Sequence, residues 1–99
     1  MSFHELVLKL LEGIRDAGTR ADITATLTYL MELYRIGRIS DEKLLGELRE
    51  LCLDVLMEKY PLKDIEELRA EAEECAESFY RAMRLQTIRS RYMRILPSE

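Results

Sequence analysis

The apolar stripe of the last expected helix changes sides partway along, and this change limits how the chain can fold. From Asp64 to about Leu96 the sequence contains no proline or glycine. At about 100° per residue, one apolar set falls on one helix face and a second set centres roughly 140° away. The first half of the helix therefore needs one packing partner and the second half another. The first set is Ile65, Leu68, Ala72, Cys75, Phe79, Met83 and Gln86; the second is Leu85, Ile88, Tyr92, Ile95 and Leu96.

The charges of this helix change at the same point. Residues 64–77 carry seven acidic side chains against the single base Arg69, whereas residues 78–96 carry five arginines and no acid. The whole chain has a formal net charge of −4, which by itself argues against nucleic-acid binding. The basic terminal segment keeps that function open.

Length and composition indicate one globular domain. The chain has 99 residues, of which 47% are hydrophobic and 34% charged, enough for one modest core. No stretch approaches the roughly 18 consecutive apolar residues that span a bilayer. The first residues are amphipathic and include Glu5, unlike a signal peptide, so we expect a cytoplasmic protein. The absence of asparagine, with 34% charged residues, leans toward a thermophilic source.

Capping signals divide the chain into four expected helices, over residues 2–17, 20–36, 41–60 and 64–96. Ser2 and Glu5 form a capping box at the first start, and Gly18 is the expected stop. Thr19 is the expected cap of the second helix. The fold class is therefore all-α, a small four-helix bundle with a long last helix.

The two later joints carry the clearest signals. Gly37 can adopt a left-handed conformation and Ser40 can cap the third helix. Pro61 ends that helix, because it lacks an N–H and disfavours a helical residue before it. Asp64 is the expected cap of the last helix.

The second helix is expected to be the central one. From Ile23 to Tyr34 its only charged residue is Glu32, a pattern typical of a helix buried on several sides. Residues 23–29 also alternate like a strand, but no other segment could pair with them. Helix is therefore the favoured prediction, with the threonine hydroxyls bonded one turn back.

The last helix is longer than a domain of this size. About 33 residues would measure roughly 50 Å, against roughly 30 Å for the domain. The helix must overhang the bundle or kink near residues 84–88. After a kink, the second stripe would fold back onto the first helix.

The cysteines and the histidine carry little chemistry. Cys52 and Cys75 are too few for a disulfide framework or zinc site, and a hairpin about residues 60–62 would place Cys52 near residue 70. We expect two separate buried thiols, with an intermolecular disulfide as the remote alternative. His4 is expected on a polar surface, without the partners of a base or ligand.

No catalytic, metal or cofactor motif is present. Four glutamates lie at helical spacing, but without the histidines of di-metal bundles they are expected to be solvated. One histidine cannot support a triad, and the glycines are isolated. The expectation is a non-enzyme with no cofactor and no metal. The four glutamates are Glu67, Glu71, Glu74 and Glu77.

The arginines admit three interpretations. They could be solvated side chains at a helix C-terminus, contacts to nucleic-acid phosphates, or partners of the acidic half of a second copy. Four of them cluster within roughly 140° of the helix circumference. These four are Arg81, Arg84, Arg91 and Arg94.

The sequence therefore favours a self-associating structural or adaptor protein, most simply a two-fold homodimer. The expected interface is Leu85, Ile88, Tyr92, Ile95 and Leu96, rimmed by Arg84, Arg91 and Arg94. The alternative is a nucleic-acid-binding regulator that uses the four clustered arginines. A membrane partner is not expected.

Overall fold

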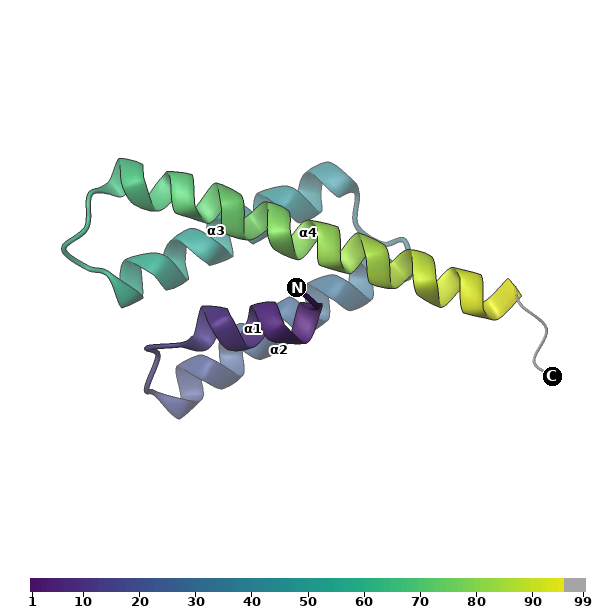
Figure 1. Cartoon of the computed structure of the whole chain (residues 1–99), viewed down its shortest axis with the longest axis horizontal. Helices are drawn as coiled ribbons and strands as arrows, with labels where there is room; N and C mark the ends of the chain where they lie inside the picture. Colours follow the sequence, from purple (N-terminus) through teal and green to yellow (C-terminus); the bar gives the residue numbers. More distant parts are fainter. Residues whose placement is uncertain (96–99) are drawn as a thin grey trace.

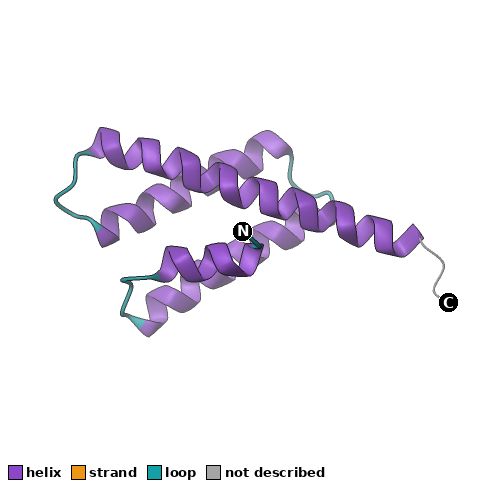
Figure 2. Ribbon diagram, viewed as in Figure 1, coloured by secondary structure: helices purple, strands orange, loops and turns teal. Residues whose placement is uncertain are grey.

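The protein folds into two helical hairpins, and the described residues form no strand. The computed structural model describes the backbone of residues 1–95 and the side chains of residues 1–91. The helices are α1 (Phe3–Leu11), α2 (Ala17–Arg35), α3 (Asp41–Lys59) and α4 (Ile65–Ile95). Figure 1 shows α1 with α2 as one antiparallel pair and α3 with α4 as the other, and Figure 2 shows the short joints between them. The all-α prediction is confirmed.

The first joint differs from the predicted one. The expected helix over residues 2–17 ends at Leu11, and Gly13, with a φ of +88°, makes the turn. Asp16, and not Thr19, caps α2: its Oδ2 accepts from the Thr19 backbone nitrogen at 2.8 Å. Gly18, the predicted stop, lies in the first turn of α2.

The end of this helix was predicted too late in the sequence because the apolar stripe continues into the loop. Ile14, the last residue of the stripe, is buried although it is not helical. The Arg20 side chain makes the early end possible, because its Nη1 donates to the carbonyls of Leu11 and Ile14, each at 2.9 Å. The Leu11 carbonyl also accepts from the Ile14 nitrogen at 3.0 Å, so Arg20 adds a second bond there and supplies a donor to the Ile14 carbonyl in the loop.

The capping signals predicted at Ser2, Gly37 and Ser40 are confirmed, whereas the cap at Asp64 stays a prediction. The Ser2 Oγ accepts from the Glu5 nitrogen at 3.2 Å, with the reciprocal bond of a capping box. Gly37 has a φ of +75°, and the Ser40 Oγ accepts from the Lys43 nitrogen at 3.1 Å. The helix α3 ends at Lys59, just before Tyr60 and Pro61.

The prediction that the second helix is central is wrong. Within α2 only Ile23, Leu27 and Leu30 are buried, and Tyr29 is 64% exposed. The hydroxyls of Thr24 and Thr26 donate to carbonyls one turn back, at 2.9 and 2.8 Å. These threonines are therefore satisfied within their own helix, and the lack of charge in α2 does not signal burial.

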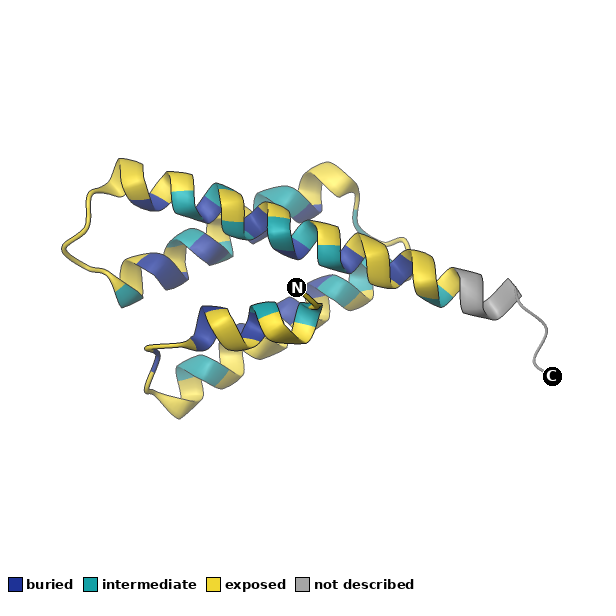
Figure 3. Ribbon diagram, in the orientation of Figure 1, coloured by how far each residue is buried: buried dark blue, intermediate teal, exposed yellow. Residues whose placement is uncertain are grey.

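The core instead centres on the packing of α3 against α4. Leu44, Leu48 and Cys52 of α3 are fully buried, as are Ala76 and Met83 of α4. Figure 3 shows the buried residues along the inner sides of the helices. The buried stripe of α4 runs at steps of three and four residues; its members are Leu68, Ala72, Ala76, Phe79, Met83 and Thr87.

The two cysteines were predicted to lie apart, but in the structure they are in contact. Their Sγ atoms lie 2.8 Å from one another. The predicted hairpin turned at residues 60–62. In the structure the segment from Tyr60 to Asp64 is not helical and α4 begins only at Ile65, so the turn is longer. Residue 52 therefore contacts residue 75, and the long Arg49 side chain also pairs across this hairpin, with Glu73 at 2.7 Å.

The helix α4 continues past the bundle without interruption. It stays α-helical through residues 84–88, so the overhang alternative applies and the fold-back of the second stripe onto α1 does not. Figure 1 shows its C-terminal part extending beyond the other three helices, and the molecule measures 54 × 27 × 22 Å. Within the described part of the chain, no helix combines the length and hydrophobicity needed to cross a bilayer.

Replacing Phe79 should destabilise the whole fold. Phe79 is 1% exposed and meets Phe3 edge-on, with ring centroids 6.0 Å apart. We expect Phe79→Ala to lower the free energy of unfolding by about 3–5 kcal/mol, because it leaves a cavity. Chemical denaturation followed by circular dichroism measures this. Leu62→Ala, at a position 99% exposed, is the control and should change it by less than about 0.5 kcal/mol.

Candidate interaction surface

Leu85 and Ile88, the two predicted apolar interface residues whose side chains the structure describes, lie on a solvent-exposed side of α4. Leu85 is 49% exposed and Ile88 is 51% exposed. Tyr92 and Ile95 belong to the helical backbone, but their side chains, like Leu96, lie outside the described residues. We call Leu85, Ile88, Tyr92, Ile95 and Leu96 the outer stripe. Its contribution to an interface stays a prediction.

The same turns of α4 also carry a buried side. Met83 is fully buried and Thr87, one turn later, is 6% exposed. Gln86, which the first apolar set included, is exposed, and Thr87 takes the inner position instead. This segment of α4 therefore packs on the bundle with one side while it presents Leu85 and Ile88 to solvent with another.

The apolar surface around Leu85 extends to the N-terminus of the chain. A shallow depression of about 280 Å³ is lined by Met1 and Leu6 together with Ala82 and Leu85 of α4. Met1 is 73% exposed. Ser78 and Arg81 also line the depression, so Leu85 adjoins a surface of mixed polarity whose apolar part is Met1, Leu6 and Ala82. The sequence pattern does not reveal this contact, because the N-terminal segment and α4 meet only in the tertiary structure.

The clustered arginines are not equivalent. The Arg81 guanidinium lies 3.9 Å from the Glu77 carboxylate of its own helix. The Arg84 Nη1 donates to the Tyr80 hydroxyl at 3.1 Å. Arg91 is exposed and has no ion-pair partner within residues 1–91. The side chain of Arg94 lies outside the described residues.

Arg84 belongs to a small polar and aromatic cluster at the joint between α2 and α3. Tyr80 lies beside Tyr34 of α2, with ring centroids 6.2 Å apart. Burial, and after it the nearby Asp41 carboxylate, raises the pKa of Tyr34 to about 12. This cluster holds Arg84 against the bundle, so Arg84 is less free than Arg91 to reach a partner.

Three acidic side chains in the first half of α4 have ion-pair partners in their own chain. Glu73 pairs with Arg49 of α3 at 2.7 Å, Glu71 pairs with Lys63, and Glu77 pairs with Arg81. Within residues 1–91, no three or more His, Cys, Asp or Glu side chains gather as a metal site would require. His4 is exposed on α1, as predicted.

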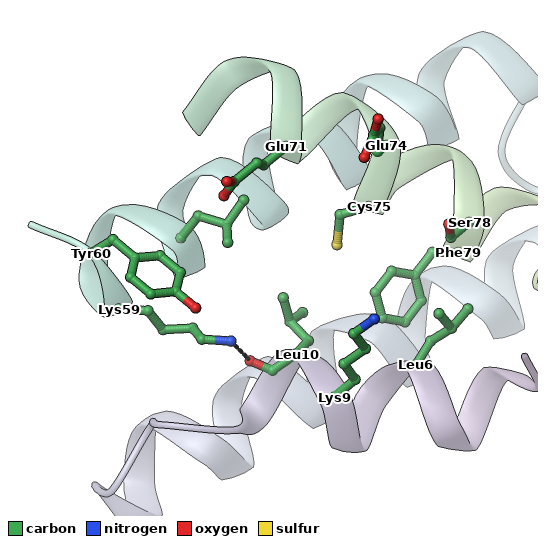
Figure 4. A pocket seen from close by; sticks show the side chains of 11 residues that line it. Leu6, Lys9, Leu10, Lys59, Tyr60, Glu71, Glu74, Cys75, Ser78 and Phe79 are labelled. Carbon is green, nitrogen blue, oxygen red and sulfur yellow. Dashed lines mark hydrogen bonds between the residues drawn. The ribbon is translucent and has the colours of Figure 1, made fainter. Parts of the chain in front are cut away.

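Sequence reasoning missed a pocket between α1, α3 and α4. Its volume is about 360 Å³, and it brings together Lys9, Lys59 and Cys75 from three different helices. Figure 4 shows the Cys75 thiol pointing into this pocket and the Lys59 ammonium donating to the Leu10 carbonyl, at 3.1 Å. No sequence spacing links these residues, because their approach depends on how the two hairpins pack.

No family model, curated protein or solved structure matches this chain.

Because the pKa of Tyr34 is raised in the folded protein, we expect the protein to lose stability at high pH. Between pH 10 and about 12 the unfolded chain ionises this phenol while the native state keeps its proton. The contribution of Tyr34 to the free energy of unfolding is therefore fully present below pH 10 and is lost as the pH rises through this range. Urea unfolding across the range should show a weaker pH dependence for Tyr34→Phe than for the wild type. Tyr29→Phe, at an exposed position, should follow the wild type.

Proposed function

We propose that this chain is a non-catalytic, cytoplasmic assembly or adaptor protein that pairs with a second copy of itself through the outer stripe of α4. The observation that carries the proposal is that Leu85 and Ile88 are each about half exposed, on a helix that extends beyond the rest of the bundle. Adjacent exposed apolar side chains on a soluble protein commonly mark an interaction site.

A second α4 is the partner that best fits this surface. Figure 1 shows the C-terminal part of α4 extending beyond the other three helices, where another helix would lie along it. In a two-fold pair the same patch meets itself, so the outer stripe of one copy would cover that of the other. The apolar side chains of Met1 and Leu6 would extend the contact.

The energetics require the whole outer stripe. Burying the remaining surface of a half-exposed leucine or isoleucine contributes about 1 kcal/mol, so Leu85 and Ile88 of two copies contribute about 4 kcal/mol. Association costs at least that much, and a stable interface buries about 800 Å² on each partner. We therefore propose that Tyr92, Ile95 and Leu96 take part as well, with Arg84, Arg91 and Arg94 at the solvated rim.

The ion pairs favour contact between outer stripes over contact between basic and acidic halves. Glu71, Glu73 and Glu77 would have to exchange their present partners to meet arginines of another copy. Surface ion pairs add at most about 1 kcal/mol each, so such an exchange gains little. Apolar burial is the stronger proposed driving force.

This dimer should dissociate when a charge enters the outer stripe. We expect Ile88→Asp to weaken association by about 100-fold, because a carboxylate would be buried without a partner. Light scattering over a concentration series measures the molar mass. Leu62→Asp makes the same kind of change at a loop position that is 99% exposed, and it should keep the wild-type mass. A dimer that survives both Leu85→Asp and Ile88→Asp would contradict the proposed interface.

Salt separates this function from nucleic-acid binding. Apolar pairing should persist at high salt, and Arg91→Ala should leave the mass unchanged, since this side chain would lie at the rim. A phosphate-binding surface would lose affinity steeply with salt and with each arginine removed. The alternative function would be supported if the protein is a monomer that binds a short nucleic-acid duplex at low salt, and if Arg91→Ala abolishes this binding.

A further inference from the structure

The two cysteines form a close pair across the α3–α4 hairpin. They are 23 residues apart in sequence, and their Sγ atoms lie 2.8 Å from one another. A disulfide has an S–S distance of about 2.05 Å, so the two sulfurs are already within an ångström of that separation. Both are free thiols in this structure.

The two thiols differ in access. Cys52 is fully buried between α3 and α4, whereas Cys75 is partly exposed. Cys75 lines the pocket of about 360 Å³ between α1, α3 and α4, and its thiol points into it, as Figure 4 shows. Cys52 is not among the residues that line this pocket. A small solute can therefore reach Cys75 first.

Positive charge borders the accessible sulfur. Lys9 and Lys59 line the same pocket, and Lys59 is held in place by its bond to the Leu10 carbonyl. Donation from Cys52 lowers the pKa of Cys75; burial opposes this, and Lys59 and Lys9 add to the lowering. The same hydrogen bond, with burial, raises the pKa of Cys52. Since the thiolate is the nucleophile, Cys75 is the more reactive of the pair.

Two carboxylates also line this pocket and act in the opposite direction. Glu71 is paired with Lys63, which reduces its effect on the Cys75 sulfur. Glu74 is exposed to solvent, where water screens its charge. The pKa of Cys75 is therefore set by the Cys52 hydrogen bond and the two lysines, which lower it, against burial, which raises it.

We propose that Cys75 is a modification site for hydroperoxides and that Cys52 is its resolving thiol. In the first step the Cys75 thiolate attacks a peroxide oxygen, the O–O bond breaks, and the sulfur becomes a sulfenic acid while the other oxygen leaves as hydroxide or alkoxide. In the second step the Cys52 sulfur attacks the Cys75 sulfur, the S–O bond breaks, and one water leaves with the Cys52 proton and the sulfenic hydroxyl. The sulfur pair loses two electrons, and the peroxide gains them.

The resulting disulfide would fasten α3 to α4 in the arrangement they already have. Because the sulfurs are already in contact, oxidation should stabilise the hairpin and leave its packing in place. A crosslink that closes a loop of this length raises stability mainly by restricting the unfolded chain. The reversible change would suit a cytoplasmic protein, where disulfides are usually transient and redox-sensing.

The test is to treat the folded, reduced wild-type protein with equimolar hydrogen peroxide. We expect a product in which each single chain is lighter by two hydrogen atoms and no chains are crosslinked to one another, with loss of both free thiols and a peptide map that joins Cys52 to Cys75. The melting temperature should rise by several degrees and return after a dithiol reductant is added. Sulfinic acid at Cys75 with no crosslink, or a crosslink only between chains, would overturn the proposal.

Two single variants assign the roles. In Cys52→Ala, peroxide should leave a sulfenic acid on Cys75 that dimedone traps, and in Cys75→Ala the remaining Cys52 should resist peroxide. Oxidation of Cys52 in the second variant at the wild-type rate would contradict the assignment. The wild type supplies a readout that does not depend on the folding of a variant: limiting iodoacetamide should alkylate Cys75 before Cys52, and equal rates would count against the proposal.

Discussion

The packing of α3 against α4 is the interaction on which the rest of the structure depends. The middle of the contact is formed by short side chains on α4, at Ala72, Cys75 and Ala76, so α3 can approach closely enough to bring Cys52 within 2.8 Å of Cys75. Leu44 and Leu48 fill the remaining space without exposure to solvent. The α1–α2 hairpin then covers the open side of this pair, with Phe3 meeting Phe79 edge-on.

The difference in length between the two central helices gives the molecule its distinctive surface. The helix α3 has 19 residues and α4 has 31, so α4 must continue where α3 offers no further contact. Its buried stripe extends to Thr87, while Leu85 and Ile88 on another side of the same turns remain half exposed. Half of the surface of Leu85 and Ile88 stays in contact with solvent in a single chain, and association with a second chain is the use we propose for it.

Local signals predicted the helices better than they predicted the packing. The caps at Ser2 and Ser40 and the turn at Gly37 depend only on neighbouring residues, and they were placed correctly. The end of the first helix was misplaced because Ile14 is buried from a loop whose carbonyls Arg20 satisfies from the next helix. The second helix was wrongly predicted to be central because it carries little charge. Its threonines donate hydrogen bonds within their own helix, so the lack of charge does not require burial.

The sequence by itself determined the all-α class, the division into four helices, and the two-sided pattern of the last one, because capping and periodicity act over one or two helical turns. The candidate residues Leu85 and Ile88 followed from that pattern, and they are exposed as it suggested. Only the tertiary structure decided that α4 overhangs, that Met1 and Leu6 adjoin Leu85, and that Cys52, Cys75, Lys9 and Lys59 meet. These arrangements depend on the angle and offset at which helices pack, which the side chains of the whole core set together.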